Sequence, residues 1–423
     1  MDAFFNKLAL IVKDSTLRMR ILFVVFALLV FRVLAAIPIP GIDIVQLENF
    51  FSNNQFLGLL NIFSGGGLST LSIVMLGVGP YITASIIMQL LTIMSPKLKE
   101  LYQEEGEAGR KRFQQYSRLL TIPLALIQGF SFYILLQRQG IILDTGLLTT
   151  VTNVMVIAAG SMLLMWVGEL ITEFGIGNGV SLIIFAGIVA SLPTTMSQLL
   201  FTFDISQLPL YLGFILVGVL ITAGVVVVTE AERPIPITYA RRVRGMKVYG
   251  GISTYLPLRV NQAGVIPIIF ALSILLFPQM IFGFLANLNI TFVSSVAAAI
   301  VRGLSHQAIY AVLYFFLVFI FTYFYTAVTF DPENISKNLQ KSGAFIPGVR
   351  PGRMTSEYIA KILTRLTLVG AVFLGLIAIL PLGMRALTGI TALAIGGTAL
   401  LIAVSVVLDL VKKIDAQVAM REY

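Results

Sequence analysis

The sequence predicts an all-α integral membrane protein, and three observations support this class. Hydrophobic residues make up 57% of the 423 positions, charged residues only 12%, and the mean hydropathy is +0.94. A soluble domain carries about twice that share of charge. Apolar runs of about 20 residues, the length needed to cross the hydrocarbon core, recur along the chain. The alternating segments of about 10 residues that mark a membrane β-barrel are absent from the sequence.

Ten apolar runs are long enough to be transmembrane helices. Two further segments are expected to lie in the membrane interface. One is the N-terminal stretch 1–20, which has a basic amphipathic pattern, and the other is 291–301, which is apolar but too short to span. The expected spans are approximately 21–37, 72–94, 119–137, 150–170, 180–201, 208–229, 262–286, 305–328, 359–381 and 390–411.

Basic residues predict the orientation of these spans. Of the 29 Lys and Arg, 25 fall on one side: the N-terminal stretch, 95–118, 230–260, 330–365 and the C-terminal stretch. Cytoplasmic loops carry the excess of Lys and Arg, so both termini are expected in the cytoplasm. The net charge of +9 is therefore first a signal of topology.

Ten spans divide into two sets of five, 1–201 and 202–423. Because five is odd, two similar halves must lie in opposite orientations across the membrane. The second span contains GVGPYI at 77–82 and the seventh contains GVIPII at 264–269, which are equivalent places in the two halves. Glycine and proline at matched positions indicate the functional centre of an inverted repeat, although both residues are also common in membrane helices.

The sequence contains no pattern typical of an enzyme or a metal site. Cysteine is absent and His306 is the only histidine, which excludes thiolate sites and two-histidine sites. No catalytic residue, metal or cofactor is therefore expected. Ionisable residues within the spans, such as Arg32, Glu169 and Arg365, lie near span ends, where they can snorkel to the interface. Glu169 and Glu173 are expected to cap or pair locally around the turn EFGIGNG.

Two cytoplasmic loops are unusually long and polar for so apolar a chain. The loop at about 230–260 combines a basic cluster with prolines and is expected to form a protruding hairpin. The loop at about 330–358 contains helix-cap and turn signals. A short basic stretch would be enough to fix topology, and long ordered loops are usually functional. We therefore expect both loops to be docking surfaces.

Several motifs together resemble the SecY family of protein-conducting channels, over essentially the whole chain. The resemblance implies two inverted five-helix halves around a central hourglass pore with a lateral opening to membrane lipids, in the bacterial plasma membrane. It also implies as partners SecE, SecG, the SecA ATPase, the ribosome, and secretory preproteins with their signal sequences. The motifs are PIPGID, NIFSGGGLSTLSIVMLGVGPYITASIIMQLL, EEGEAGRKR, LMWVGELITEFGIGNGVSLIIFAGIVA, STYLPLRVNQAGVIPIIFA, NLQKSGAFIPGVRPG and IGGTALLI.

The resemblance also implies roles for individual residues. A plug at about 56–70, joined flexibly and packed weakly, would include Asn61, Ser64, Gly65, Gly66 and Gly67. An aliphatic pore ring would consist of Val78, Ile82, Ile184, Ile269 and Ile402. A lateral gate between the second and third spans and the seventh and eighth would include Thr83, Gln89 and Phe277. Docking of SecA or the ribosome would use Arg241, Arg242, Arg244, Lys247, Arg350 and Arg353.

The expected function is a passive, gated channel that translocates unfolded preproteins and releases transmembrane segments laterally. A small-solute secondary transporter with a five-plus-five inverted repeat is the alternative. Such transporters usually place ionisable groups near the middle of the membrane, and the spans here are nearly free of them. An intramembrane enzyme is the third class, and the sequence contains no recognisable catalytic set for it.

Overall fold

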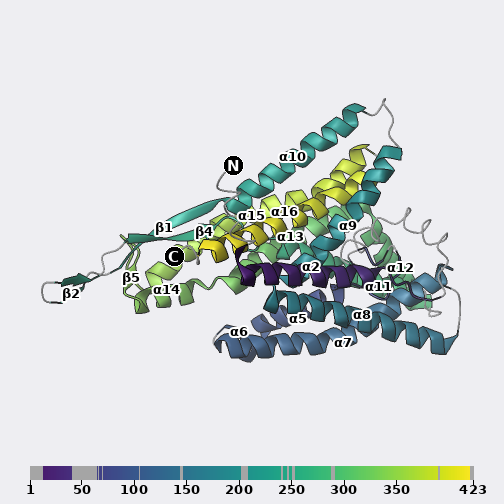
Figure 1. Ribbon diagram of the computed structural model, residues 1–423, viewed down its shortest axis with the longest axis horizontal. Helices are drawn as coiled ribbons and strands as arrows, with labels where there is room; N and C mark the ends of the chain where they lie inside the picture. Colours follow the sequence, from purple (N-terminus) through teal and green to yellow (C-terminus); the bar gives the residue numbers. More distant parts are fainter. Residues whose placement is uncertain are drawn as a thin grey trace.

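A computed structural model describes most of the chain as a bundle of long helices with a small sheet projecting from one end (Figure 1). The helices of the first half are α2 (Ser15–Ala35), α5 (Gly79–Met94), α6 (Pro96–Gln103), α7 (Gly106–Arg138), α8 (Leu147–Phe174) and α9 (Gly179–Phe201). Those of the second half are α10 (Leu208–Glu230), α11 (Ile266–Leu285), α12 (Thr291–Ser305), α13 (Gln307–Thr329), α14 (Pro332–Lys341), α15 (Arg353–Thr388) and α16 (Thr391–Ala419). The described residues are 13–40, 64, 66–68, 70–103, 105–142, 146–201, 208–239, 242–244, 247–249, 253–286, 291–388 and 391–419.

Several of these helices have the length and composition of membrane spans. Within the described ranges, five helices are long and apolar enough to cross a bilayer. A sixth candidate arises if α5 and α6, which meet at a bend of 117°, are taken together as one broken span. The protein is therefore a mostly helical chain with several membrane-spanning candidates.

The start of α2 differs from the expected first span. The helix begins at Ser15, where the Asp14 carboxylate accepts a hydrogen bond from the Thr16 N–H at 2.9 Å and caps the helix. Part of the stretch expected to form a separate interfacial helix is thus continuous with the first long helix. Residues 1–12, which carry the rest of that expectation, lie outside the described residues.

The second expected span also begins later than the sequence predicted. Residues 72–78 form successive turns, and α5 starts only at Gly79, with Pro80 in its first turn. Proline is favoured at this place because its fixed φ suits a helix start and the missing N–H has no helical partner there. The prediction of a helix over 72–78 is wrong.

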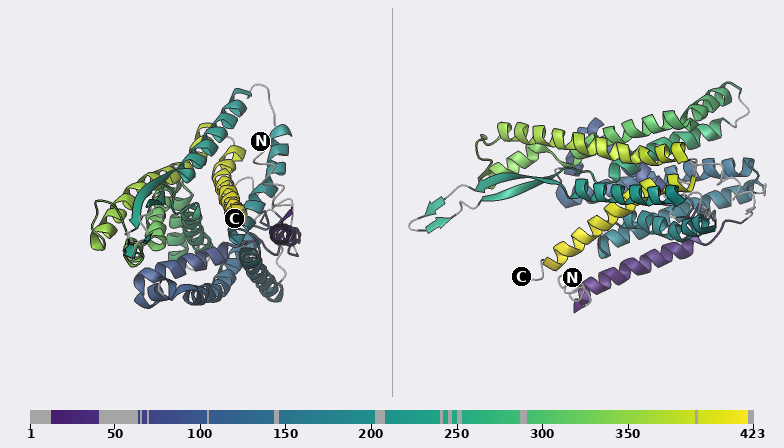
Figure 2. Two further views of the ribbon diagram at one scale, coloured as in Figure 1. Left: turned by 60° about the vertical axis from the view of Figure 1, so that its left-hand side comes forward. Right: turned by 90° about the horizontal axis from the view of Figure 1, so that it is seen from above.

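The two polar loops form one small domain at the end of the bundle. Strands β1 (Glu232–Tyr239) and β4 (Ser253–Arg259) pair antiparallel, as the expected hairpin requires, and β2 (Arg242–Arg244) pairs with β3 (Lys247–Tyr249) toward its tip. Strand β5 (Ala344–Phe345) of the second loop adds to β1, so the sheet order is β4-β1-β5. Figure 2 shows the hairpin extending beyond the helix ends.

An apolar cluster fixes this small domain to the bundle. Ile235 and Leu258 from the hairpin pack with Ile346 of the second loop and with Ile359 and Ile362 of α15. The Ser336 hydroxyl on α14 donates to the Gly352 carbonyl at 2.7 Å, which closes the second loop on itself. The two loops therefore form one surface rather than two independent ones.

Candidate functional site

The five aliphatic residues expected to form a ring lie in one continuous buried cluster. They come from four separate helices or their starts, and each is at most 5% exposed. Two belong to the first half at the start of α5, one lies on α9, one on α11 and one on α16. These residues are Val78, Ile82, Ile184, Ile269 and Ile402.

Matched backbone breaks place two of these residues. Gly77 has a φ of +58° and Gly264 a φ of +62°, and each stands two residues before a helix that carries a proline in its first turn. An L-residue with a Cβ is disfavoured in this left-handed region. Both breaks thus start a helix abruptly, with Ile82 and Ile269 in its first turns. The repeat signal read from the sequence corresponds to equivalent local structures.

Residues 56–63, 65 and 69 of the expected plug, among them Asn61 and Gly65, lie outside the described residues. The described residues of this stretch lie in turns, with Gly66 at a φ of +85°. The Ser72 N–H donates a hydrogen bond to the Gly67 carbonyl at 2.8 Å, and the Leu68 N–H donates one to the Ser64 hydroxyl at 3.0 Å.

The segment that follows the glycines is closely packed. Leu68 and Leu71 are at most 1% exposed, and the Thr70 hydroxyl donates to the Ala35 carbonyl at the end of α2 at 2.8 Å. The Ile39 N–H donates to the Leu71 carbonyl at 3.0 Å. Weak packing was expected of the plug at about 56–70; of its described residues, Ser64, Gly67 and Leu68 are buried and Thr70 is exposed, and most of the residues from Leu71 to Val78 that follow are buried.

The helices expected to border a lateral gate are neighbours. Helix α11 packs against α5 and α7 of the first half and against α13 of its own half. Thr83 on α5 is buried, and its hydroxyl donates to the Gly79 carbonyl at 3.0 Å. The Gln89 side-chain N–H donates to the Ser85 hydroxyl at 3.4 Å. Phe277 lies on α11, and its side chain is outside the described residues.

The expected docking residues fall on the small domain at the end of the bundle. Arg242 and Arg244 lie on β2 and Lys247 on β3, while Arg241 lies outside the described residues. Arg350 is exposed in the second loop, and its carbonyl accepts from the Thr355 hydroxyl at 2.9 Å. Arg242, Arg244 and Lys247 thus lie in the separate two-stranded sheet toward the tip of the hairpin, whereas Arg350 lies in the second loop beside the β4-β1-β5 sheet.

Arg353 stands at the start of α15 in an exposed ion pair. Its Nε donates to a Glu357 carboxylate oxygen at 2.9 Å, one helical turn further along, and its side chain is 91% exposed. Exposed pairs of this spacing contribute little to stability, so the guanidinium remains accessible to a partner.

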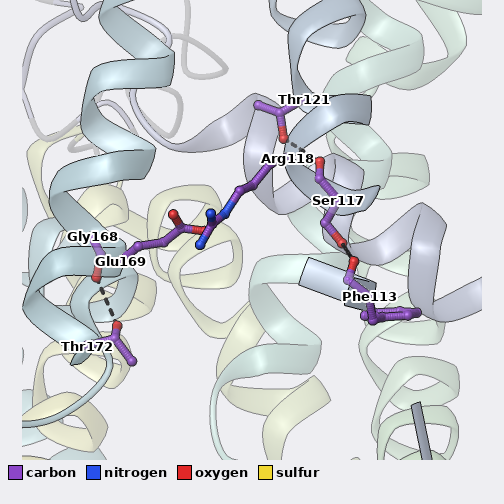
Figure 3. Close-up of polar contacts among 7 residues, drawn as sticks. All are labelled: Phe113, Ser117, Arg118, Thr121, Gly168, Glu169 and Thr172. Carbon is purple, nitrogen blue, oxygen red and sulfur yellow. Dashed lines mark hydrogen bonds and ion pairs between the residues drawn. The ribbon is translucent and has the colours of Figure 1, made fainter. Parts of the chain in front are cut away.

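Glu169 pairs across two helices rather than locally, which corrects the prediction from sequence. The Nε of Arg118 on α7 donates to a carboxylate oxygen of Glu169 on α8 at 2.6 Å (Figure 3). The hydroxyl of Thr172 donates to the Gly168 carbonyl and accepts from the Gly179 N–H. Arg118 and Glu169 are 51 positions apart, so no local pattern could have paired them.

The comparisons with known proteins agree with this arrangement. The family model SecY matches residues 72–411. The chain belongs to the SecY family. Protein translocase subunit SecY of Streptomyces scabiei is 41% identical over 429 aligned positions, covering 97% of each chain. Protein translocase subunit SecY of Synechocystis is 42% identical over 416 positions, covering 96% of this chain and 93% of that one.

Solved structures share the fold of this SecY family member. A structure described as a protein-conducting channel superposes with a TM-score of 0.66 at 19% identity, covering 96% of this chain and 93% of that one. Sec61 in a canine ribosome–channel complex from the endoplasmic reticulum gives a TM-score of 0.62 at 18% identity, with the same coverage. At this identity the likeness concerns the fold alone.

Proposed function

We propose that this chain is the channel subunit of a protein translocase, which passes unfolded preproteins across the bacterial plasma membrane and releases apolar segments sideways into lipid. Membership of the SecY family and the names of its relatives support the general function. The observation specific to this chain is that five aliphatic side chains, contributed by both halves, all belong to the main buried apolar cluster of the bundle.

An apolar ring suits a channel that must admit many different sequences. Branched aliphatic side chains make a narrow constriction that tends to lose its water, which raises the barrier to ions. They also offer no hydrogen bond to a passing chain and therefore do not select its sequence. We assign this role to Val78, Ile82, Ile184, Ile269 and Ile402, in an hourglass pore enclosed by ten membrane-spanning helices.

The segment at about 56–70 is proposed to close the pore when no polypeptide is present. Its described end is seated through the turn after Gly66 and Gly67 and through the Thr70 hydrogen bond to α2. A structure related in fold is described as one in which the plug domain of SecY stabilises the closed channel and maintains a membrane seal. For the present chain the same role is a proposal.

The partners proposed for this chain are SecE, SecG, the SecA ATPase and the ribosome. The joined surface of the two loops supports a docking role, because it carries exposed basic groups on a framework fixed by sheet pairing and by apolar packing against α15. A related fold is described in complex with a ribosome. We also propose that both termini face the cytoplasm.

Deleting residues 57–67 tests the channel directly. In planar bilayers at equal protein density, the deletion variant should pass more ions than the unaltered protein, because it lacks most of the segment proposed to close the pore. A small-solute transporter would lose activity or misfold and would gain no ion conductance. An unchanged conductance in a variant that still folds would refute the proposed plug.

A further inference from the structure

A cavity lies where the sheet domain meets the helix bundle. It borders the backbone break before α11, which is the second half's counterpart of the break before α5. Its volume is about 290 Å³, and it is bounded by the start of α9, the end of β4, the turn at 260–265 and the side of α16. Tyr325, Thr329 and Ser405 contribute to its wall. The cavity opens at the end of the bundle from which the hairpin projects, close to the proposed docking surface.

The charged side chains around this cavity are already neutralised. Arg259 pairs with Glu232 at 3.1 Å, Lys412 with Glu230 at 2.8 Å, and Lys413 with Asp409 at 2.7 Å. A charged ligand would have to compete with these internal partners. The wall is therefore better suited to a neutral, hydrogen-bonding guest.

Two neighbouring amides retain unmet hydrogen-bonding capacity. Asn261 is only 6% exposed, and its Nδ2 donates to the Gly264 carbonyl at 3.2 Å. Within the described part of the chain, Asn261 Oδ1 and Gln262 Nε2 are shielded from solvent and have no hydrogen-bond partner. A buried polar group without a hydrogen-bond partner is unfavourable. One atom is an acceptor and the other a donor.

The backbone that carries these amides is held firmly. The Val260 N–H donates to the Ala231 carbonyl at 2.9 Å, which ties the turn to the hairpin base. On its other side the turn touches α15, where a Cβ at Gly370 would lie 2.8 Å from the Val260 carbonyl oxygen. Asn261 and Gln262 both line the cavity, so a side-chain rotation is enough to turn their shielded atoms toward a guest, and the turn itself need not move.

We propose that Asn261 and Gln262 hydrogen-bond the main chain of an extended polypeptide segment in this cavity. Asn261 Oδ1 accepts from a backbone N–H, and Gln262 Nε2 donates to a backbone carbonyl. Every residue of an extended chain repeats this donor and acceptor, so the contact is independent of side-chain sequence. The inference rests on the proposed function, and its occupant is the preprotein in transit.

The position of the two amides also indicates where along the path of the polypeptide this contact is made. A bound main chain would supply the donor and the acceptor that these two atoms lack among the described residues. The amides would hold the entering chain on the hairpin side of the aliphatic ring, before it reaches the constriction.

Cysteine crosslinking tests the position of the guest. The chain contains no cysteine, so Gln262→Cys adds a single reactive thiol, and Ile215→Cys, on the exposed side of α10, is the matched control. Each variant is reconstituted with its partner subunits and loaded with a stalled preprotein that carries one cysteine at successive positions. Crosslinks at Gln262→Cys but not at Ile215→Cys are expected.

The same experiment shows whether the polypeptide in the cavity belongs to the preprotein or to a docked partner. A preprotein crosslink supports the proposal. Crosslinking only to the docked ATPase or to the ribosome assigns the amides to a partner loop and overturns it. If crosslinkers at Ile82 and Ile402 reach the preprotein while Gln262→Cys does not, the inference fails and the proposed function stands. If none of the three reaches it, both fail.

A second measurement tests main-chain recognition itself. Replacing one backbone amide of the stalled segment by an ester removes a single N–H, and a set of such substrates scans the register. At one register the release rate of the unaltered channel should rise about 2- to 10-fold, the range of one hydrogen bond. With Asn261→Leu the amide and ester substrates should be released at equal rates.

Two results of this measurement would overturn the inference. One is an ester effect that persists in Asn261→Leu, and the other is the absence of any ester effect in the unaltered channel. Gln262→Met provides a second variant if Asn261→Leu does not fold, since the Gln262 Nε2 has no partner to lose. It should release the amide substrate about 2- to 10-fold faster than the unaltered channel, and an unchanged rate contradicts the proposal.

Discussion

The two glycine–proline breaks at the starts of α5 and α11 share a backbone geometry but differ in their surroundings. Before α5, the segment 71–78 packs closely, and Leu71, Val74 and Val78 are fully buried. Before α11, the turn at 260–265 borders a cavity and leaves two amide atoms without partners among the described residues. The first break is therefore closely packed, whereas the second borders open space and has two polar atoms without partners among the described residues.

This difference shows how the same kind of backbone break, repeated in the two halves, can have two different functions. In an inverted repeat the equivalent breaks face opposite sides of the membrane, so they need not perform the same function. The packed turn before α5 is suited to seating a closing segment. The open turn before α11 is suited to receiving a chain from the side of the proposed docking surface.

The largest expected effect comes from crowding the packed break. Gly160 on α8 lies so close to the turn that a Cβ there would lie 2.1 Å from the Ile73 carbonyl oxygen. Gly160→Ala should therefore lower the free energy of unfolding by about 3 kcal/mol, because backbone atoms on both sides must move. Chemical denaturation in detergent measures this change. Gly218→Ala, at an open position on α10, is the control and should show no loss.

The open break should be less sensitive to crowding. A Cβ at Gly370 on α15 would lie 2.8 Å from the Val260 carbonyl oxygen, which is a milder overlap than the 2.1 Å at Gly160. Gly370→Ala should cost about 2 kcal/mol, with Gly383→Ala on the same helix as a harmless control. If Gly370→Ala proved more damaging than Gly160→Ala, the contrast between the two breaks would be wrong.

The two left-handed glycines should respond alike. Gly77→Ala and Gly264→Ala should each cost about 1–2 kcal/mol, because each forces a Cβ into the left-handed region. Gly79→Ala, which has open space and an ordinary φ, serves as the control. Thermal unfolding of all three variants in one detergent would compare them. A cost at only one of the two glycines would show that the geometry is not truly matched.

The smallest effect is expected from the ion pair that joins α7 to α8. Glu169→Gln should lower stability by about 0.5–1 kcal/mol, since the Arg118 side chain is 40% exposed and solvent screens the pair. The loss should shrink as salt is raised, and denaturation at low and high ionic strength measures it. A loss that does not depend on salt would indicate a packing role for Glu169.

The sequence predicted the parts of the fold that depend on local signals. The glycine–proline pattern marked the two equivalent places where the structure has its breaks, although both were expected inside continuous spans, and prolines with a basic cluster predicted the hairpin of β1 and β4. It failed at 72–78, because an apolar run such as LSIVMLG suits a buried turn as well as a helix. Pairing of β5 with β1 depends on residues about 100 positions apart, and no local pattern encodes it.

The candidate site could be predicted only in part. An aliphatic residue in a membrane helix carries no local mark of function, so the ring residues came from the family resemblance alone. The unmet amides of Asn261 and Gln262 were missed for a different reason. Whether a buried amide has a partner depends on packing between distant segments, here the hairpin base and α15.

Photocrosslinking from the proposed pore ring most directly tests the central claim, which is that a polypeptide in transit passes through this ring. A photoreactive side chain replaces Ile82 in one variant and Ile402 in another, with Ile215 on the exposed face of α10 as the control, and each variant is loaded with a stalled secretory chain. Crosslinks from both Ile82 and Ile402 to the same short segment of that chain, with none from Ile215, are the predicted result. If a chain stalled partway through a channel that exports the unstalled substrate normally gave crosslinks from neither position, the account would be contradicted.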